Sequence, residues 1–214
     1  MRIKTIDLPN PLRPGRRRML VGAASLLVAG AVLPAVAQTV KSPPATPEDD
    51  LGPFYPPDWS GEIDADLTRF AGAGAEGTPL RLTGRVVDRK GRPVADAVVE
   101  IWQTDARGRY RHPGVPERLR DPGFQGYGRT MTDAAGAYAF VTVMPGRYGT
   151  RPPHIHLRLA RPGLREFVTQ IYFKGDNGEG GLGGIVPPGR DALSVDAMAS
   201  SDGRRAARFD IVLP

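Results

Sequence analysis

The sequence predicts an all-β protein, a β-sandwich or barrel built from short strands. Short runs of apolar or alternating residues recur from residue 79 to the C-terminus, and turn-forming residues separate them. No stretch outside the N-terminal segment has the periodicity of an amphipathic helix, although residues 190–200 could hold a helical turn. The length of 214 residues allows one domain with a tail.

The predicted strands follow one another at short intervals. In chain order they are residues 80–88, 97–103, 128–132, 137–143, 154–160, 166–173 and 207–214. The turn sequence RKGRP joins the first two of these strands, and DAAG joins the third and fourth. Strands of this length and spacing are typical of a β-sandwich.

Residues 1–37 have the features of a twin-arginine-type signal peptide. Arg16 and Arg17 precede an apolar run from Met19 to Leu33, and Ala35-Val36-Ala37 matches a small-x-small cleavage site. The alternatives are an ordinary secretory signal and an uncleaved anchor. The run is short for a membrane span of ~20 residues, so we expect no stable membrane anchor. The sequence predicts export to the periplasm or the medium, by a route that carries folded proteins with their cofactors.

The basic charge of the chain is concentrated in that N-terminal segment. The whole chain has a formal net charge of +6, but residues 1–37 hold six basic residues and one acidic residue. The remaining residues are close to neutral, which argues against nucleic-acid binding. The absence of cysteine excludes disulfides, thiolate metal sites and thiol nucleophiles.

The remaining chain divides into an arm and a domain. Residues 38–50 are polar and proline-rich and are predicted to be a linker or N-terminal arm. Residues 51–59 are apolar but interrupted by prolines, so we expect an extended, docked segment rather than a helix. The predicted β-sandwich domain covers residues 51–214.

Two of the three histidines lie one residue apart in the predicted strand HIHLRLA. Side chains two apart in a strand share a face, so His154 and His156 point together, while Ile155, Leu157 and Leu159 point to the opposite, core-facing side. Converging imidazoles are a common metal-binding device. Two strand histidines without a metal are an equally good interpretation of this short motif.

The residue types limit the other ligands that a metal could have. A carboxylate would indicate a ferrous site with two histidines, whereas a tyrosinate would indicate ferric iron, which can remove a phenol proton of pKa ~10. Tyr110 and Tyr148 follow glycine-containing turns and could reach the histidine face. Tyr138 and Tyr172 lie in predicted strands and are interpreted as packing residues. Spacing alone does not decide among these ligand sets.

Several stretches together resemble the intradiol ring-cleavage dioxygenases. They are, in family order, GPFYPP, GRVVDRKGRPVADAVVEIWQTDARGRYRH, DPGFQGYGRTMTDAAGAYAFVTVMPGRY, RPPHIHLRL, VTQIYFKGD and RFDIVLP. They span residues 51–214. The combination of EIWQ, GRY and RPPHIH is specific to the family.

The resemblance implies a β-sandwich core with long active-site loops and little helix around a mononuclear non-haem iron(III). Its implied ligands are Tyr110, Tyr148, His154 and His156. The implied reaction is the cleavage of a catechol-type small molecule by O2 to a cis,cis-muconate-type product. Tyr148 would leave the metal and act as a base when the diol binds.

The resemblance also implies roles around the metal. Arg151 would stabilise charge on the substrate, and Gln170 would line the same pocket. Trp102 would lie beside the site, and Phe54 and Tyr55 would form a wall of the substrate pocket. The simpler alternatives are a surface arginine, a polar strand residue, a core tryptophan and two aromatics that pin the N-terminal arm.

Two other classes of function remain open from the sequence. GRVVDRKGRPVADAVVEIW is also similar to the transthyretin-like sandwiches that serve as non-catalytic binding modules. A β-sandwich that binds copper or another metal is the second alternative. A homo-oligomer is compatible with either assignment.

The GEGGLG stretch at 178–183 lacks a following helix, since Pro187 and Pro188 come next, so it is interpreted as a loop rather than a nucleotide-binding turn.

Overall fold

A computed structural model describes residues 42–56, 59, 61–174 and 189–214. The chain divides into two compact units, Met1–Thr39 and Val40–Pro214, and all described residues belong to the second. The predicted signal peptide and the GEGGLG loop lie outside the described residues. None of the helices in the described part is long and apolar enough to span a membrane.

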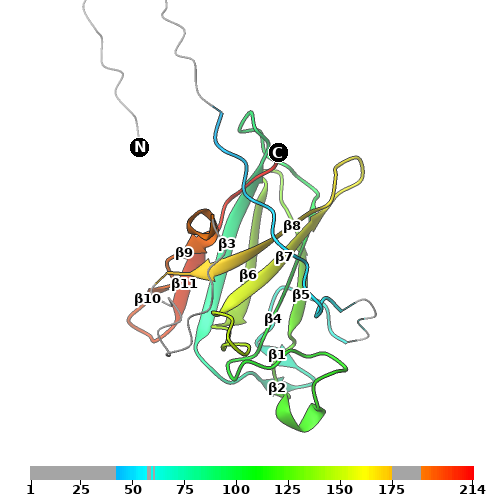
Figure 1. The fold of residues 1–214 in the computed structure, drawn as a ribbon, viewed down its shortest axis with the longest axis vertical. Coiled ribbons are helices and arrows are strands. Elements are labelled where there is room, and N and C mark those ends of the chain that lie inside the picture. Colours follow the sequence, from blue (N-terminus) through cyan, green and yellow to red (C-terminus); the bar gives the residue numbers. More distant parts are fainter. Residues whose placement is uncertain (1–41, 57–58, 60, 175–188) are drawn as a thin grey trace, which may run out of the picture. The chain divides into compact units, whose positions relative to one another are not determined.

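The described residues form a sandwich of two five-stranded sheets, which confirms the predicted fold class (Figure 1). One sheet has the order β10-β11-β3-β12, with β6 also paired to β3. The other has the order β5-β4-β7-β8-β9. A small hairpin of β1 and β2 and two short 3₁₀ helices, η1 and η2, complete the structure. The bounds are β1 Arg69–Phe70, β2 Ala73–Gly74, β3 Pro79–Val87, β4 Val98–Gln103, η1 Glu117–Leu119, β5 Tyr127–Met131, β6 Ala137–Val143, β7 His154–Ala160, β8 Phe167–Phe173, η2 Arg190–Leu193, β9 Ser194–Val195, β10 Met198–Ala199, β11 Arg205–Arg208 and β12 Ile211–Val212.

The core lies between the two sheets and follows the alternation of the strands. In β7 the residues Ile155, Leu157 and Leu159 are completely buried in the core, as the sequence predicts. Leu82 on β3 and Phe140 on β6 are among the residues that meet them from the other sheet. The residues that alternate with these on β7 point to the outer surface of its sheet.

The C-terminal segment differs from the single strand predicted over 207–214. It forms β11 and β12, both parallel to β3 and in the same register, with a break at Phe209 and Asp210. At the break Tyr138 Oη donates to the Phe209 carbonyl (2.6 Å), and Arg85 N donates to the Asp210 carboxylate (2.9 Å). Side-chain hydrogen bonds therefore satisfy backbone groups that a continuous ladder would pair.

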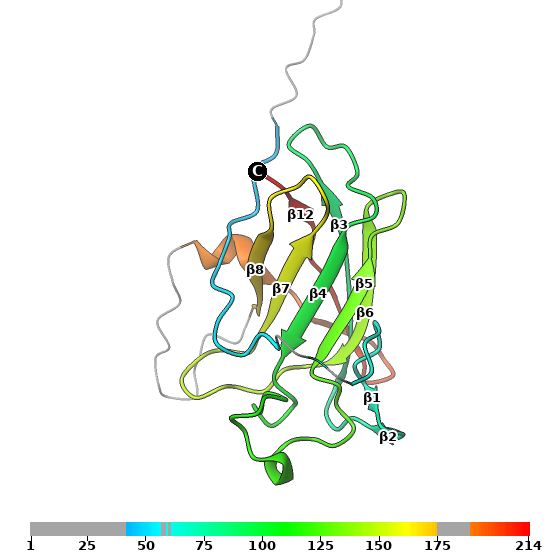
Figure 2. The same ribbon diagram turned by 90° about the vertical axis from the view of Figure 1, so that its right-hand side faces the viewer.

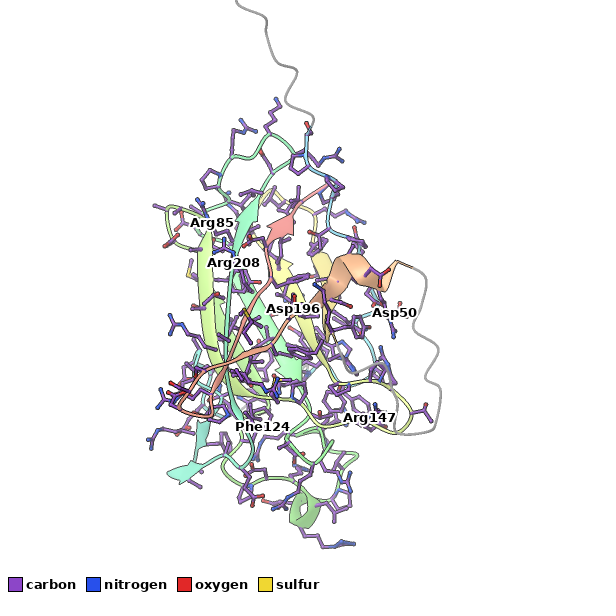
Figure 3. The ribbon with its side chains drawn as sticks, turned by 90° about the vertical axis from the view of Figure 1, so that its left-hand side faces the viewer. Asp50, Arg85, Phe124, Arg147, Asp196 and Arg208 are labelled. Atoms are coloured by element: carbon purple, nitrogen blue, oxygen red, sulfur yellow. The ribbon has the colours of Figure 1, made fainter. Side chains whose placement is uncertain are left out.

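An N-terminal strap, defined here as residues 46–55, crosses the outer face of the β5-β4-β7-β8-β9 sheet. Figures 1 and 2 show it, blue to cyan, beside β8. Thr46 N bonds to the Val212 carbonyl (2.9 Å), and Asp49 N bonds to the Val168 carbonyl (3.0 Å). Figure 3 labels Asp50 on this strap, and its carbonyl accepts from Gln170 Nε2 at 2.7 Å. The strap covers the face that carries the two histidines.

Candidate metal centre

The strand register aligns the polar residues of the outer sheet face. His156 pairs with Trp102 on β4 and with Gln170 on β8, and His154 pairs with Tyr172 on β8. Both histidines are buried, with exposed fractions of 3% for His154 and 1% for His156. An outer sheet face usually meets water, so the burial of both histidines means that other parts of the chain, the strap among them, cover this face.

Tyr110 reaches the histidines from the turn after β4. The Asp105 carboxylate accepts from the backbone N–H groups of Arg107 and Arg109, each at 2.9 Å, which closes the turn. Gly108 has a φ of +80°, and a Cβ there would lie 1.9 Å from the Arg147 carbonyl oxygen, so only glycine fits. Tyr110 follows this turn and is itself buried.

Three atoms that could bind a metal converge at the centre of the site. Tyr110 Oη lies 3.1 Å from His154 Nε2 and 3.1 Å from His156 Nε2, and the two Nε2 atoms are 3.2 Å apart. His154 Nδ1 lies 2.7 Å from the Pro152 carbonyl oxygen. A carbonyl only accepts, so Nδ1 carries the proton and a neutral His154 presents a lone pair at Nε2.

The protons available cannot satisfy this triangle of contacts. Three hydrogen bonds would need three protons, but the Tyr110 hydroxyl supplies one and a neutral His156 at most one. Lone pairs on these three atoms therefore face each other and repel. A cation at the centre would remove this repulsion. A metal-binding histidine that donates its other N–H to a carbonyl has the same arrangement. The described residues contain no group of three or more His, Asp or Glu side chains suited to a metal, so a metal here would need tyrosine oxygen.

Burial sets the protonation of the three groups. It lowers the pKa of His154 to about 4 and that of His156 to about 2, and the neighbouring His154 lowers the latter further. It raises the pKa of Tyr110 well above its usual range, although the Arg151 charge opposes this. At neutral pH both imidazoles are therefore uncharged and can offer a nitrogen lone pair to a metal ion. The phenol keeps its proton until a cation binds.

Tyr148, the fourth predicted ligand, lies at the edge of this cluster. Its ring centroid is 5.5 Å from that of Tyr110 and 5.0 Å from that of Phe54, and 37% of the residue is exposed. The short turn to Arg151 is closed by a bond from Arg151 N to the Tyr148 carbonyl (3.0 Å). The structure thus brings three of the four predicted ligands into contact and places the fourth ring beside them.

Arg151 and Gln170 are joined next to the histidines. Arg151 Nη2 donates to Gln170 Oε1 at 2.6 Å and to Tyr172 Oη at 3.2 Å. Tyr172 Oη also lies 2.9 Å from an Asp49 carboxylate oxygen, which can accept its proton. The sequence interpretation of Tyr172 as a packing residue is incomplete, because its ring is buried but its hydroxyl belongs to this polar group.

Of the three aromatic residues predicted near the metal, Phe54 and Trp102 contact the cluster and Tyr55 packs behind Trp102. Phe54 stacks on Tyr110 with ring centroids 4.3 Å apart, and Trp102 stacks on His156 at 4.9 Å. Tyr55 contacts Trp102 edge-on at 5.0 Å. Phe54 and Tyr55 also belong to the strap, so both fix the arm, and Phe54 in addition lines the cluster.

Sequence reasoning missed a second polar group beneath Tyr55. Glu100 is 5% exposed, and its carboxylate accepts from Tyr127 (2.7 Å), Tyr55 (3.1 Å) and Arg158 (2.7 Å). Glu100 and Arg158 are paired across β4 and β7 and point away from the core. Their opposite charges at outward strand positions are the sequence feature that could have revealed this group. Gly52 was also missed. It has a φ of +70°, and a Cβ there would lie 3.0 Å from His156 Cε1.

The sequence of the domain matches known proteins. The family model described as dioxygenase matches residues 51–214. The chain is 43% identical over 140 residues to the protocatechuate 3,4-dioxygenase beta chain of Burkholderia cepacia, covering 60% of this chain and 59% of that one. It is 31% identical over 180 residues to the alpha chain from the same organism, covering 78% and 90%.

A solved structure has the same fold. The dioxygenase domain of a dioxygenase carbohydrate-binding protein fusion from Streptomyces sp. SirexAA-E has a TM-score of 0.62 and 28% identity, covering 79% of this chain and 98% of that one. The chain spans only 59%, 52% and 55% of the length of the first three curated relatives.

Proposed function

The chain belongs to the intradiol ring-cleavage dioxygenase family, and on that basis we propose that it cleaves a catechol-type diol with O2 to a cis,cis-muconate-type product. The convergence of Tyr110 Oη with two histidine Nε2 atoms within 3.2 Å is the observation that carries the proposal. A non-catalytic binding module has no need for such a buried set of metal-binding atoms.

The residues that would hold a mononuclear iron(III) are Tyr110, Tyr148, His154 and His156. Two phenolate oxygens are hard anionic ligands that suit a trivalent ion, and neutral imidazole nitrogens also bind iron. Bound iron would act as a Lewis acid that takes up the deprotonated diol and polarises it for reaction with O2.

The chain's own groups would prepare and stabilise the substrate. The exposed position of Tyr148 suits a ligand that moves aside and accepts a proton from the incoming diol. The Arg151 guanidinium, held by Gln170 and Tyr172, would stabilise negative charge that develops on the substrate oxygen. Phe54 and Trp102 would exclude water from the ring.

Oxygen uptake with isotope labelling tests the proposed activity. Given catechol, protocatechuate or hydroxyquinol, the iron-loaded protein should consume one O2 per diol cleaved and place both ¹⁸O atoms in the product. Tyr110→Phe should abolish this. Tyr138→Phe is the matched control, because it also deletes one buried tyrosine hydroxyl but lies in β6. Activity retained in Tyr110→Phe, or no uptake by the unaltered protein with any of the three diols, would contradict the proposal.

Export is proposed from residues 1–37 alone. The protein would leave the cytoplasm by the twin-arginine route and lose this segment. A variant with Arg16→Lys and Arg17→Lys should accumulate uncleaved in the cytoplasm, whereas the unaltered chain should appear outside it. Cytoplasmic retention of the unaltered chain would refute the proposal.

Assembly into a homo-oligomer is proposed because relatives match under the names of both alpha and beta chains. A single chain similar to both could occupy equivalent positions in a symmetric assembly. Light scattering should give a mass that is a multiple of the mature chain. A monomeric mass together with full activity would argue against it.

A further inference from the structure

A cavity lies on the other sheet, away from the histidines. It has a volume of about 550 Å³ and lies between the β1–β2 hairpin, the outer surface of β3, β6 and β11, and the turn after β10. A volume of this size can hold a small organic molecule. The residues that line it include none of those assigned to the candidate metal centre.

The floor of this cavity is apolar. Arg81 pairs with Val141 on β6 and with Ala206 on β11, so the three side chains lie side by side on the outer face. Ala75 and Val143 are among the other residues that line it. A ligand lying on this surface would contact small aliphatic groups.

The cavity also gathers positive charge. Four arginines line it, and Asp66 is the one acidic residue among its lining residues. Arg204 pairs with Asp202, and Arg205 donates to the Ala197 carbonyl. The Asp66 carboxylate accepts from the backbone and hydroxyl of Thr68.

Two of the four arginines have side chains that bond to no other described residue. Within the described part of the chain, neither Arg69 nor Arg81 makes a side-chain hydrogen bond or an ion pair, although both line the cavity. Like charges collected at one site repel one another, and an anion would relieve this. Guanidinium groups bind carboxylates in a forked geometry that a single ammonium cannot provide.

We propose that this cavity binds a small carboxylic acid with an apolar body, with Arg69 and Arg81 on the carboxylate and Val141 and Ala206 beneath the apolar part. The arginines select the charge, and the floor selects a flat or aliphatic body over a small hydrated anion. The site is independent of metal binding and of the proposed ring cleavage.

Calorimetric titration of the iron-loaded protein with benzoate tests this assignment. We expect a dissociation constant of about 1 mM or tighter, equivalent to about −4 kcal/mol. Acetate and phosphate lack the apolar body and benzamide lacks the charge, so each should bind at least about tenfold more weakly, a difference of ~1.4 kcal/mol.

Two variants locate the binding site. The double variant Arg69→Gln/Arg81→Gln should weaken benzoate binding at least about tenfold. The control is Arg161→Gln, an exposed arginine between β7 and β8 that does not line the cavity. Equal affinity in the double variant and the control would place benzoate elsewhere, the metal centre included, and overturn the proposal. Equal affinity for acetate, phosphate or benzamide, or no benzoate binding up to about 10 mM, would also overturn it.

Discussion

Replacing Gly52 with alanine should disturb the candidate metal centre through the strap. Gly52 has a φ of +70°, where an L-residue costs about 1–2 kcal/mol more than glycine. The new Cβ would also lie 3.0 Å from His156 Cε1, whereas carbon atoms pack best at about 3.5–4.0 Å. The ring or the strap must therefore move by about 0.5 Å.

Gly72→Ala is a matched control for this variant. Gly72 has a φ of +80°, and a Cβ there would meet no atom within 4 Å. It carries the backbone strain without the collision, so the difference between the two variants reports the contact with His156.

Urea unfolding and iron content measure the two effects. Gly72→Ala should lose about 1–2 kcal/mol of unfolding free energy and keep its iron. Gly52→Ala should lose more stability than this and bind less iron. Each kcal/mol corresponds to about 2–4 °C in melting temperature for a domain of this size. Equal losses in the two variants, with unchanged iron content, would refute the contact between the strap and His156.

Three further substitutions test the packing and the polar groups. Leu157→Ala should lower the unfolding free energy by about 2–5 kcal/mol, because Leu157 is completely buried, and a loss under about 1 kcal/mol would contradict its place in the core. Glu100→Gln should cost about 1–3 kcal/mol, since it weakens the bonds from Tyr127 and Arg158, and unchanged urea unfolding would show that this group contributes nothing. Tyr172→Phe should lower kcat/KM about tenfold, equivalent to ~1.4 kcal/mol, with iron retained, because Arg151 loses one acceptor. Loss of iron in Tyr172→Phe would instead indicate a ligand role.

The sandwich and its core could be predicted because both depend on local alternation. Ile155, Leu157 and Leu159 alternate with His154 and His156 in one strand, so a single pattern gave both the core face and the histidine face. The family resemblance pointed to Tyr110, whose turn depends on nearby Asp105 and Gly108.

The remaining contacts join residues that are distant in sequence. Asp49 meets Tyr172 across 123 positions, and Tyr55 meets Glu100 across 45. No periodicity encodes such pairs, because they depend on where the strap crosses the sheet. The break between β11 and β12 depends in the same way on the Tyr138 hydroxyl reaching Phe209 from another strand.

A visible absorption spectrum of the iron-loaded protein, recorded with iron content before and after anaerobic addition of catechol, tests the proposed iron site directly. A ferric tyrosinate site should give a broad tyrosinate-to-iron(III) charge-transfer band that shifts when catechol binds and is lost or altered in separate Tyr110→Phe and Tyr148→Phe variants. A protein that stays colourless after reconstitution with iron would contradict the ferric tyrosinate site, and with it the proposed ring cleavage.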